Sequence, residues 1–333
     1  MHPLSGLGLR FLRGAIGLLG PAGRHSRLSI LIYHRVRPEP DPMLPGDPDA
    51  ATFRWQVQVV SRLFHVLPLA EALKRLQNGT LPPRAACITF DDGYADNHDV
   101  ALPLLREQGL PATFFVATGF LDGGMMFNDR ILEAIRRMPS GEVDLEDMGL
   151  GTRRIDGLDE RKALIKEVIQ SVKYLERGER EDKVAGLAAQ CPQALPDDLM
   201  MTTAQLKALD AAGMEIGGHT HSHPILARLT DDQARAEILQ GKETLESILG
   251  HPVRLFAYPN GKPGSDYLPQ HAAMVRECGF EAAVSTTWGV STRETDPYQL
   301  ARFTPWDASP GRFGLRLVRN LFKPHTPNLS VDS

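Results

Sequence analysis

Residues 85–94, which read AACITFDDGY, decide the fold of this chain. The first six of them form an apolar run with the length of a buried strand, and Asp91 and Asp92 follow at once. A helix is expected over about 95–108, and a second apolar strand over 112–116. Strand, helix and strand within about thirty residues predict a βαβ unit, and therefore a parallel sheet.

The same alternation continues on both sides of this unit. Helical segments separate further short apolar runs, which predict strands at 28–33, 214–217, 255–257, 282–285 and 300–303. The total of about seven strands alternating with helices predicts an α/β fold and favours a closed or nearly closed barrel over an open doubly wound sheet. In such barrels the chemistry lies on loops at the carboxyl ends of the strands.

The chain is expected to divide into a main domain and flanking segments. The main domain covers 28–310 and carries a charge-rich helical insert at about 120–200, while 1–27 form an amphipathic segment and 311–333 a C-terminal helix and tail. The apolar run near the N-terminus is six residues long, shorter than a secretory core of about 7–15. No apolar stretch reaches the roughly 20 residues of a membrane span. We therefore expect a helix resting on a membrane or on the domain, in a cytoplasmic or inner-membrane peripheral protein, with export as the alternative.

Composition excludes several classes of protein. The 333 residues include 37 Lys and Arg against 41 Asp and Glu, for a net charge of −4, and 42% are hydrophobic. These values are typical of a globular protein and give no basic excess for binding nucleic acid. Three scattered cysteines cannot build a disulfide framework or a cysteine metal cluster, and their odd number favours a reducing compartment.

Two polar groups at predicted strand ends can carry chemistry. The adjacent carboxylates of Asp91 and Asp92 point in different directions, so one can bind a metal while the other acts as a base; the alternative is an ordinary Asp-Asp-Gly turn. His219 and His223 have a spacing common in zinc sites; the alternative is a polar loop with incidental histidines. Two imidazoles and one carboxylate make the three-ligand, open arrangement of catalytic zinc. Together these groups predict metal-assisted hydrolysis of an amide or ester.

Three motifs in this order resemble those of the polysaccharide deacetylases, the NodB-homology carbohydrate esterases. They are ITFDDGY at 88–94, GHTHSHP at 218–224 and FAYPNG at 256–261. The opening strand ends in YHRV at 33–36, which is similar to the exopolysaccharide, poly-N-acetylglucosamine type branch. The resemblance implies a distorted (β/α)7 barrel that removes acetyl groups from N-acetylated sugars. It also implies one divalent metal ion, zinc in first place, with cobalt, nickel or manganese as alternatives.

The resemblance further implies a role for particular residues. The implied metal ligands are Asp92, His219 and His223. Asp91 would be the general base that deprotonates the metal-bound water. A backbone N–H in the turn Tyr258-Pro259-Asn260, in first place that of Asn260, would stabilise the oxyanion of the attacked acetamide.

Three features depart from the family pattern or extend it. Ala257 stands where the third motif usually has the arginine that orients the base, and Arg254 would lie on the opposite face of its strand. Arg302 is the candidate substitute, or else a surface charge at a strand end. A Leu-x-x-x-His motif near the C-terminus is missing, so another residue must protonate the leaving amine. His34 is the candidate for this general acid; the alternative is that His34 makes only a structural hydrogen bond. Trp288 is a candidate floor for a sugar ring, or else a packed core aromatic.

These observations favour a metal-dependent N-deacetylase acting on an N-acetylated glycan or glycolipid of the cell envelope. Two alternatives stay open. The same scaffold can act on a small non-sugar amide, because the fold and the metal site do not determine the substrate. The missing arginine and histidine instead suggest a non-catalytic glycan-binding relative. No nucleic-acid partner is expected, and the sequence leaves the oligomeric state open.

Overall fold

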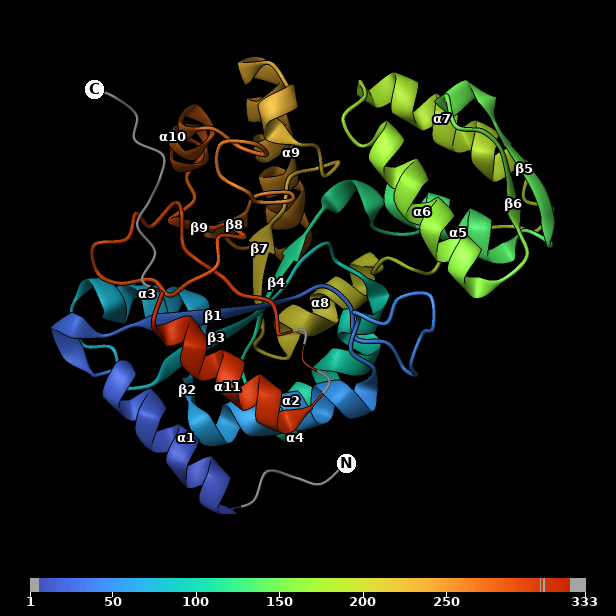
Figure 1. Ribbon diagram of the computed structural model, residues 1–333. Coiled ribbons are helices and arrows are strands. Elements are labelled where there is room, and N and C mark those ends of the chain that lie inside the picture. The colour runs from blue at the N-terminus through green and yellow to red at the C-terminus, as the bar shows by residue number, and fades with distance from the viewer. Residues whose placement is uncertain (1–5, 306, 308, 324–333) are drawn as a thin grey trace.

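A curled sheet of seven strands forms the centre of the computed structural model, which describes residues 6–305, 307 and 309–323 (Figure 1). The strand order is β1-β3-β4-β7-β8-β9, with the short β2 beside the start of β3. All pairings within this sheet are parallel. The sheet curls into a half-barrel, and the helices pack around it. The expectation of an α/β fold with a distorted barrel is confirmed.

The elements follow one another in strict alternation over much of the chain. The strands of the main sheet are β1 (Leu28–Tyr33), β2 (His65–Val66), β3 (Ala85–Phe90), β4 (Thr113–Val116), β7 (Glu215–Gly218), β8 (Leu255–Ala257) and β9 (Ala282–Val284). The accompanying helices are α1 (Gly6–Leu19), α2 (Ala50–Leu63), α3 (Leu69–Gln77), α4 (Leu102–Glu107), α8 (Thr203–Ala211), α9 (Asp231–Leu249), α10 (Pro269–Glu277) and α11 (Pro310–Leu321). Between β4 and α8 lie α5 (Phe127–Arg137), β5 (Gly141–Leu145), β6 (Gly151–Ile155), α6 (Leu158–Val172) and α7 (Arg177–Ala189).

Alternating side chains of β3 explain how the sheet serves two separate cores. Ile88 and Phe90 belong to the large cluster beneath the surrounding helices, whereas Cys87 packs with side chains of β1, β8 and β9. Successive residues of a strand point to opposite faces, so Thr89 shares the face of Cys87. Asp91 continues this inner row directly after the strand. The strand therefore delivers Asp91 to the inside of the barrel at its carboxyl end.

The barrel closes through single bridges rather than through a full strand. The segment 300–303 was expected to be the seventh strand, but it pairs one residue at a time, Leu300 with Val284 and Phe303 with Leu31. The expected strand is therefore wrong, and the seventh strand of the sheet is β2, which has only two residues. Segment 300–303 nevertheless lies between β9 and β1, and this position carries residue 302 to the inner face.

The insert forms a lobe with its own hydrophobic cluster, seen in green in Figure 1. It is helical in α5, α6 and α7, as expected, and it also contains an antiparallel hairpin of β5 and β6 that the sequence analysis did not predict. Val143 and Leu145 of β5 point into the cluster, as does Ile155 of β6, while Asp144 is exposed. This period of two is typical of a half-buried strand, and the dense charge around it masked the pattern.

Helix α1 lies against the domain, in contact with α2 and α11. Leu12 and Ile16 are buried in this contact, whereas Phe11 and Leu18 are exposed. The N-terminal helix therefore rests on the domain, which is one of the two arrangements expected from the sequence. Among the described residues, no helix is both long enough and apolar enough to cross a membrane.

Candidate metal centre and active site

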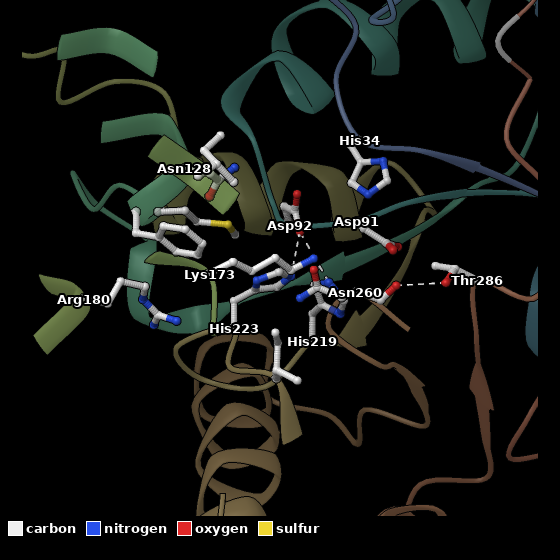
Figure 2. A pocket seen from close by; sticks show the side chains of 14 residues that line it. His34, Asp91, Asp92, Asn128, Lys173, Arg180, His219, His223, Asn260 and Thr286 are labelled. Carbon is white, nitrogen blue, oxygen red and sulfur yellow. Dashed lines mark hydrogen bonds and ion pairs between the residues drawn. The ribbon is translucent and has the colours of Figure 1, made fainter. Parts of the chain in front are cut away.

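Three candidate metal ligands converge at the carboxyl ends of β3 and β7 (Figure 2). Asp92 follows β3, and His219 and His223 follow β7. The Nε2 atoms of His219 and His223 lie 3.4 Å and 3.3 Å from Oδ1 of Asp92. Within the described part of the chain, no other group of three such side chains brings its ligand atoms this close together.

The spacing of these ligand atoms suits one small divalent cation. Ligand atoms about 2.1 Å from an ion, at tetrahedral angles, lie ~3.4 Å from one another. The two distances to Asp92 agree with this value. Two imidazoles and one carboxylate are also a donor set that zinc accepts in catalytic sites, where one position stays open for water or substrate. The residues present therefore fit a bound divalent ion.

The two histidines present their Nε2 atoms toward Asp92. The Nδ1–H of His219 donates to the carbonyl of Ala257 at 2.7 Å, which fixes the tautomer and leaves Nε2 unprotonated for a metal. Burial alone would lower the pKa of His219, but Asp92 and Asp91 raise it above its usual value. At His223 burial dominates and lowers the pKa to about 4, so this imidazole is neutral at physiological pH.

Unusual backbone conformations are concentrated at the site. Four of the six described non-glycine residues with positive φ lie in its loops: Asp92, Thr220, His223 and Asn260. Each such conformation costs of order 1–3 kcal/mol for a residue with a side chain. The surrounding structure must therefore hold these loops in place.

Helix α9 packs against the loop after β7 and fixes its position. Glu237 accepts hydrogen bonds from the N–H groups of His221 and Ser222, at 3.1 Å and 2.7 Å. Gly241, one turn further along α9, approaches the loop so closely that a Cβ atom there would lie 2.7 Å from the carbonyl of Thr220. The glycine thus permits a close approach that fixes the position of both histidine ligands.

Asp91 is buried beside the three ligands and is held by Arg302. The guanidinium donates from Nη1 to Oδ1 and from Nη2 to Oδ2, at 2.7 Å each. Its Nε donates to the carbonyl of Ser285, and Nη1 also donates to Thr89 Oγ1. Burial alone would raise the pKa of Asp91, but the charges of Arg302 and His219 lower it below its usual range. Asp91 is therefore an oriented carboxylate next to the candidate metal centre.

The turn after β8 contributes Asn260 to the site and not Tyr258. The N–H of Tyr258 donates to the carbonyl of Val284, and its ring stacks on Tyr267 in the core. Contrary to expectation, Tyr258 does not reach the pocket. Asn260 lines it, with a φ of 58°, and its carbonyl accepts from Thr286 Oγ1. Among the described residues, nothing accepts a hydrogen bond from the Asn260 N–H.

The structure brings His34 to the pocket but leaves Trp288 outside it. His34 is exposed at the end of β1 and lines the pocket together with Asp91 (Figure 2). Trp288 is not among the lining residues, and its ring lies 4.5 Å from Lys323 Nζ and 5.8 Å from the guanidinium carbon of Arg319. Contrary to expectation, Trp288 does not form the floor of this pocket.

The pocket around these groups is a cavity of about 320 Å³ with one wall from the insert. Lining residues from this wall are Met126, Phe127, Asn128, Ile169, Lys173 and Arg180. The sequence analysis predicted the insert but assigned none of these residues to the site. A weak signal was the spacing of four between Ile169 and Lys173, which puts both on one helix face.

Another buried carboxyl group, that of Asp129, lies on α5 of the insert. Asp129 accepts a hydrogen bond from the hydroxyl of Tyr94 at 3.0 Å and is 5% exposed. Burial raises the pKa of Asp129 to about 7, although the positive charge of Arg35 opposes the rise. Asp129 therefore changes its charge near neutral pH, a property that its place in the sequence does not indicate.

Known proteins are similar to this chain in sequence and in fold. The family model described as polysaccharide deacetylase matches residues 78–283, which is more than half of the chain. YxkH of Bacillus subtilis strain 168, whose name places it among the polysaccharide deacetylases, is 21% identical over 290 residues, covering 87% of this chain and 74% of that protein. The Streptococcus pyogenes deacetylase PplD in complex with acetate has a TM-score of 0.59 at 19% identity, covering 88% of this chain and 99% of that one. IcaB from Ammonifex degensii has a TM-score of 0.55 at 18% identity, covering 91% and 98%. The structural likenesses concern the fold.

Proposed function

Because the chain belongs to the polysaccharide deacetylase family, we propose that it removes N-acetyl groups from amino sugars of a polysaccharide or glycolipid, with a divalent metal ion. The observation that carries the proposal is one pocket that holds both the cluster of Asp92, His219 and His223 and the oriented carboxylate of Asp91. Hydrolysis of an amide needs a group that polarises the carbonyl and a base that activates water beside it. Asp92, His219 and His223 would hold the polarising metal ion, and Asp91 would be the base.

Zinc is the metal ion proposed in first place, with cobalt, nickel or manganese as alternatives. Asp92, His219 and His223 would hold it. When bound, the ion supplies polarisation of the acetamide carbonyl and a lower pKa for a water molecule. The neutral imidazole of His223 and the fixed tautomer of His219 favour this role.

Three further groups of the pocket would transfer protons or stabilise the developing charge. Asp91, kept ionised and oriented by Arg302, accepts the proton of the attacking water. The N–H of Asn260 donates to the oxyanion that forms from the acetamide, and one such donor is worth about 2.7–4 kcal/mol. His34 is exposed at the rim of the pocket, where it can deliver a proton to the leaving amine.

Acetate release from N-acetylglucosamine oligomers, paired with elemental analysis, tests the proposal. Asp91→Asn is expected to keep about one zinc ion per chain and to lose about 10²–10⁴-fold in turnover. Asp92→Ala is expected to lose the metal ion. Asp99→Asn, which changes an exposed carboxylate outside the pocket, is the matched control and should behave like the parent protein. Full activity of Asp91→Asn would exclude it as the base. Absence of metal from the parent protein after reconstitution would overturn the hydrolase proposal, and turnover of small amides alone would exclude the glycan.

For localisation we propose attachment to the inner face of a membrane through α1 and α11. Every charged residue of these two helices is an arginine, and large apolar side chains are exposed beside them. The exposed apolar side chains are Phe11 and Leu18 on α1 and Leu315 and Phe322 on and after α11. Cations and exposed apolar groups on one amphipathic helix favour an anionic lipid surface. The double variant Phe11→Ser, Leu315→Ser should co-sediment less with anionic vesicles than the parent protein does. Equal co-sedimentation of the two proteins would contradict this proposal.

A further inference from the structure

Arg180 on α7 is a buried cation with no anionic partner. Arg180 is 9% exposed, and its buried Nε has no hydrogen-bond acceptor among the described residues. In the described part of the chain the guanidinium makes no ion pair; it lies over the ring of Phe127, with its carbon 4.4 Å from the ring centroid. The acidic residues whose charges act on it are engaged elsewhere. Glu176 caps the start of α7, and Glu181 pairs with Arg130 at 3.0 Å.

Such an arrangement is unfavourable for the folded protein taken alone. Removing a cation from water without a compensating partner costs several kcal/mol. Burial accordingly lowers the pKa of Arg180, although a guanidinium stays charged in proteins. Residues that break the rules of packing in this way are expected at functional sites, where a ligand completes the interaction.

Arg180 also stands where two cavities meet. It lines the catalytic pocket and a second cavity of about 470 Å³ between the insert and α9. Lys173, at the end of α6, lines the catalytic pocket on the same wall and makes no ion pair among the described residues. Figure 2 shows both side chains reaching from the insert into the pocket. Two cations without carboxylate partners therefore border the space that the substrate would occupy.

We propose that Arg180 and Lys173 form a subsite for an anionic group, a phosphate or a carboxylate, that the substrate carries next to its N-acetylated sugar. This inference rests on the proposed deacetylase function and narrows its substrate to an anionic glycan. A planar guanidinium binds an oxyanion through two parallel hydrogen bonds, and an ammonium adds a mobile point charge. The oxyanion replaces the partner that the fold does not give to Arg180.

Two variants of Arg180 separate binding from packing. Arg180→Met keeps an apolar contact over Phe127 and removes the charge, whereas Arg180→Lys keeps the charge without the planar fork. Arg153→Met is the matched control, because Arg153 lies on β6 of the same lobe and already pairs with Glu167 at 2.9 Å. The substrates are N-acetylglucosamine 1-phosphate, a disaccharide of glucuronic acid and N-acetylglucosamine, and uncharged di-N-acetylchitobiose. Acetate release by zinc-loaded protein gives kcat/KM, and calorimetry on zinc-loaded Asp91→Asn protein measures binding without turnover.

The expected result is a loss that depends on the charge of the substrate. Arg180→Met should lose about 10- to 100-fold in kcat/KM and in affinity for at least one charged substrate, and less than about twofold for chitobiose. Arg180→Lys should recover part of the loss. The Tm of Arg180→Met should equal or exceed that of the parent protein, because the variant no longer buries an unpaired cation. Preference for the phosphate or for the uronic acid identifies the source of the anion.

Other outcomes would overturn the subsite. Charged substrates that bind no better than chitobiose, or an equal effect of Arg180→Met on all three substrates, would exclude an anion site. A lower Tm with no discrimination would show that Arg180 only packs on Phe127. If no substrate releases acetate, the deacetylase proposal fails, and the calorimetric comparison still decides whether Arg180 binds the anion.

Discussion

Arg302→Met tests the most specific contact of the site. The substitution keeps an unbranched apolar side chain in a fully buried position and removes the guanidinium. Two hydrogen bonds to Asp91 disappear with it, together with those to Ser285 and Thr89. Asp91 is only 2% exposed, so water has little access to replace the lost donors.

The magnitude follows from the burial of the pair. Removing one partner of a buried ion pair costs about 3–5 kcal/mol, and we expect the free energy of unfolding at pH 8 to fall by about this amount. Arg302 lowers the pKa of Asp91 in the folded protein. The stabilisation is therefore fully present above the unfolded pKa of about 3.9 and is lost as the pH falls through the folded-state pKa. Without Arg302, burial raises the pKa of Asp91, so the deficit of the variant should shrink as falling pH protonates this carboxyl.

The pH profile of acetate release gives an independent readout. A base must be ionised to act, so the acid limb of kcat/KM should move to higher pH in Arg302→Met. Arg302→Lys should show a smaller shift, because it keeps the charge and loses the paired hydrogen bonds. Arg254→Met is the control, since the Arg254 side chain is 61% exposed just before β8. An acid limb at the same pH in the parent protein and in Arg302→Met, at equal zinc content, would refute the reasoning.

Three further outcomes follow from the structure. Gly241→Ala brings a methyl carbon to 2.7 Å from the backbone of Thr220. We therefore expect the free energy of unfolding, measured in urea, to fall by about 1–3 kcal/mol and kcat to fall at least about tenfold. Unchanged values would mean that α9 does not position the loop. A chelator should lower the Tm of the zinc-loaded protein, because a ligand at 100 times its Kd stabilises the folded state by about 2.7 kcal/mol; a similar response of Asp92→Ala would place the metal elsewhere. Asp129 has a pKa of about 7 in the folded protein, above its unfolded value, so its contribution is full at low pH and is lost as the pH rises through 7. Asp129→Asn should therefore raise the free energy of unfolding by up to about 2–3 kcal/mol more at pH 8 than at pH 5, and equal effects at both values would contradict the raised pKa.

Sequence reasoning located groups whose relative positions depend on short stretches of chain. His219 and His223 share the loop after β7, and Asp92 lies in the loop after β3, so the register of β3, β4 and β7 suffices to bring them together. Arg302 is further away in the sequence, and the sequence analysis offered it as the group that orients Asp91, with a surface charge at a strand end as the alternative. The bridge of Phe303 to β1 brings Arg302 to Asp91, although the full strand does not form.

Residues whose environment depends on distant packing were out of reach. Trp288 looks like a sugar-binding aromatic in sequence, but its ring lies beside the cations Arg319 and Lys323, on α11 and just after it. Tyr258 follows a strand like a loop residue, yet its ring stacks on Tyr267. Arg180 belongs to a charged helix in which no period separates it from the exposed arginines around it. Its packing on the ring of Phe127, 53 residues earlier in the chain, becomes visible only in the structure.

The pairing of Arg302 with Asp91 has a consequence for the order in which the protein is made. The two residues are 211 positions apart, and Arg302 belongs to the last tenth of the chain. During synthesis at about 5–20 residues per second, β3 emerges well before its counter-charge does. A nascent chain that has reached only β9 would bury the Asp91 carboxylate alone, so the barrel cannot settle until segment 300–303 leaves the ribosome. Recovery of catalysis during refolding should then lag behind the recovery of helical circular dichroism, and the lag would time the closing of the barrel.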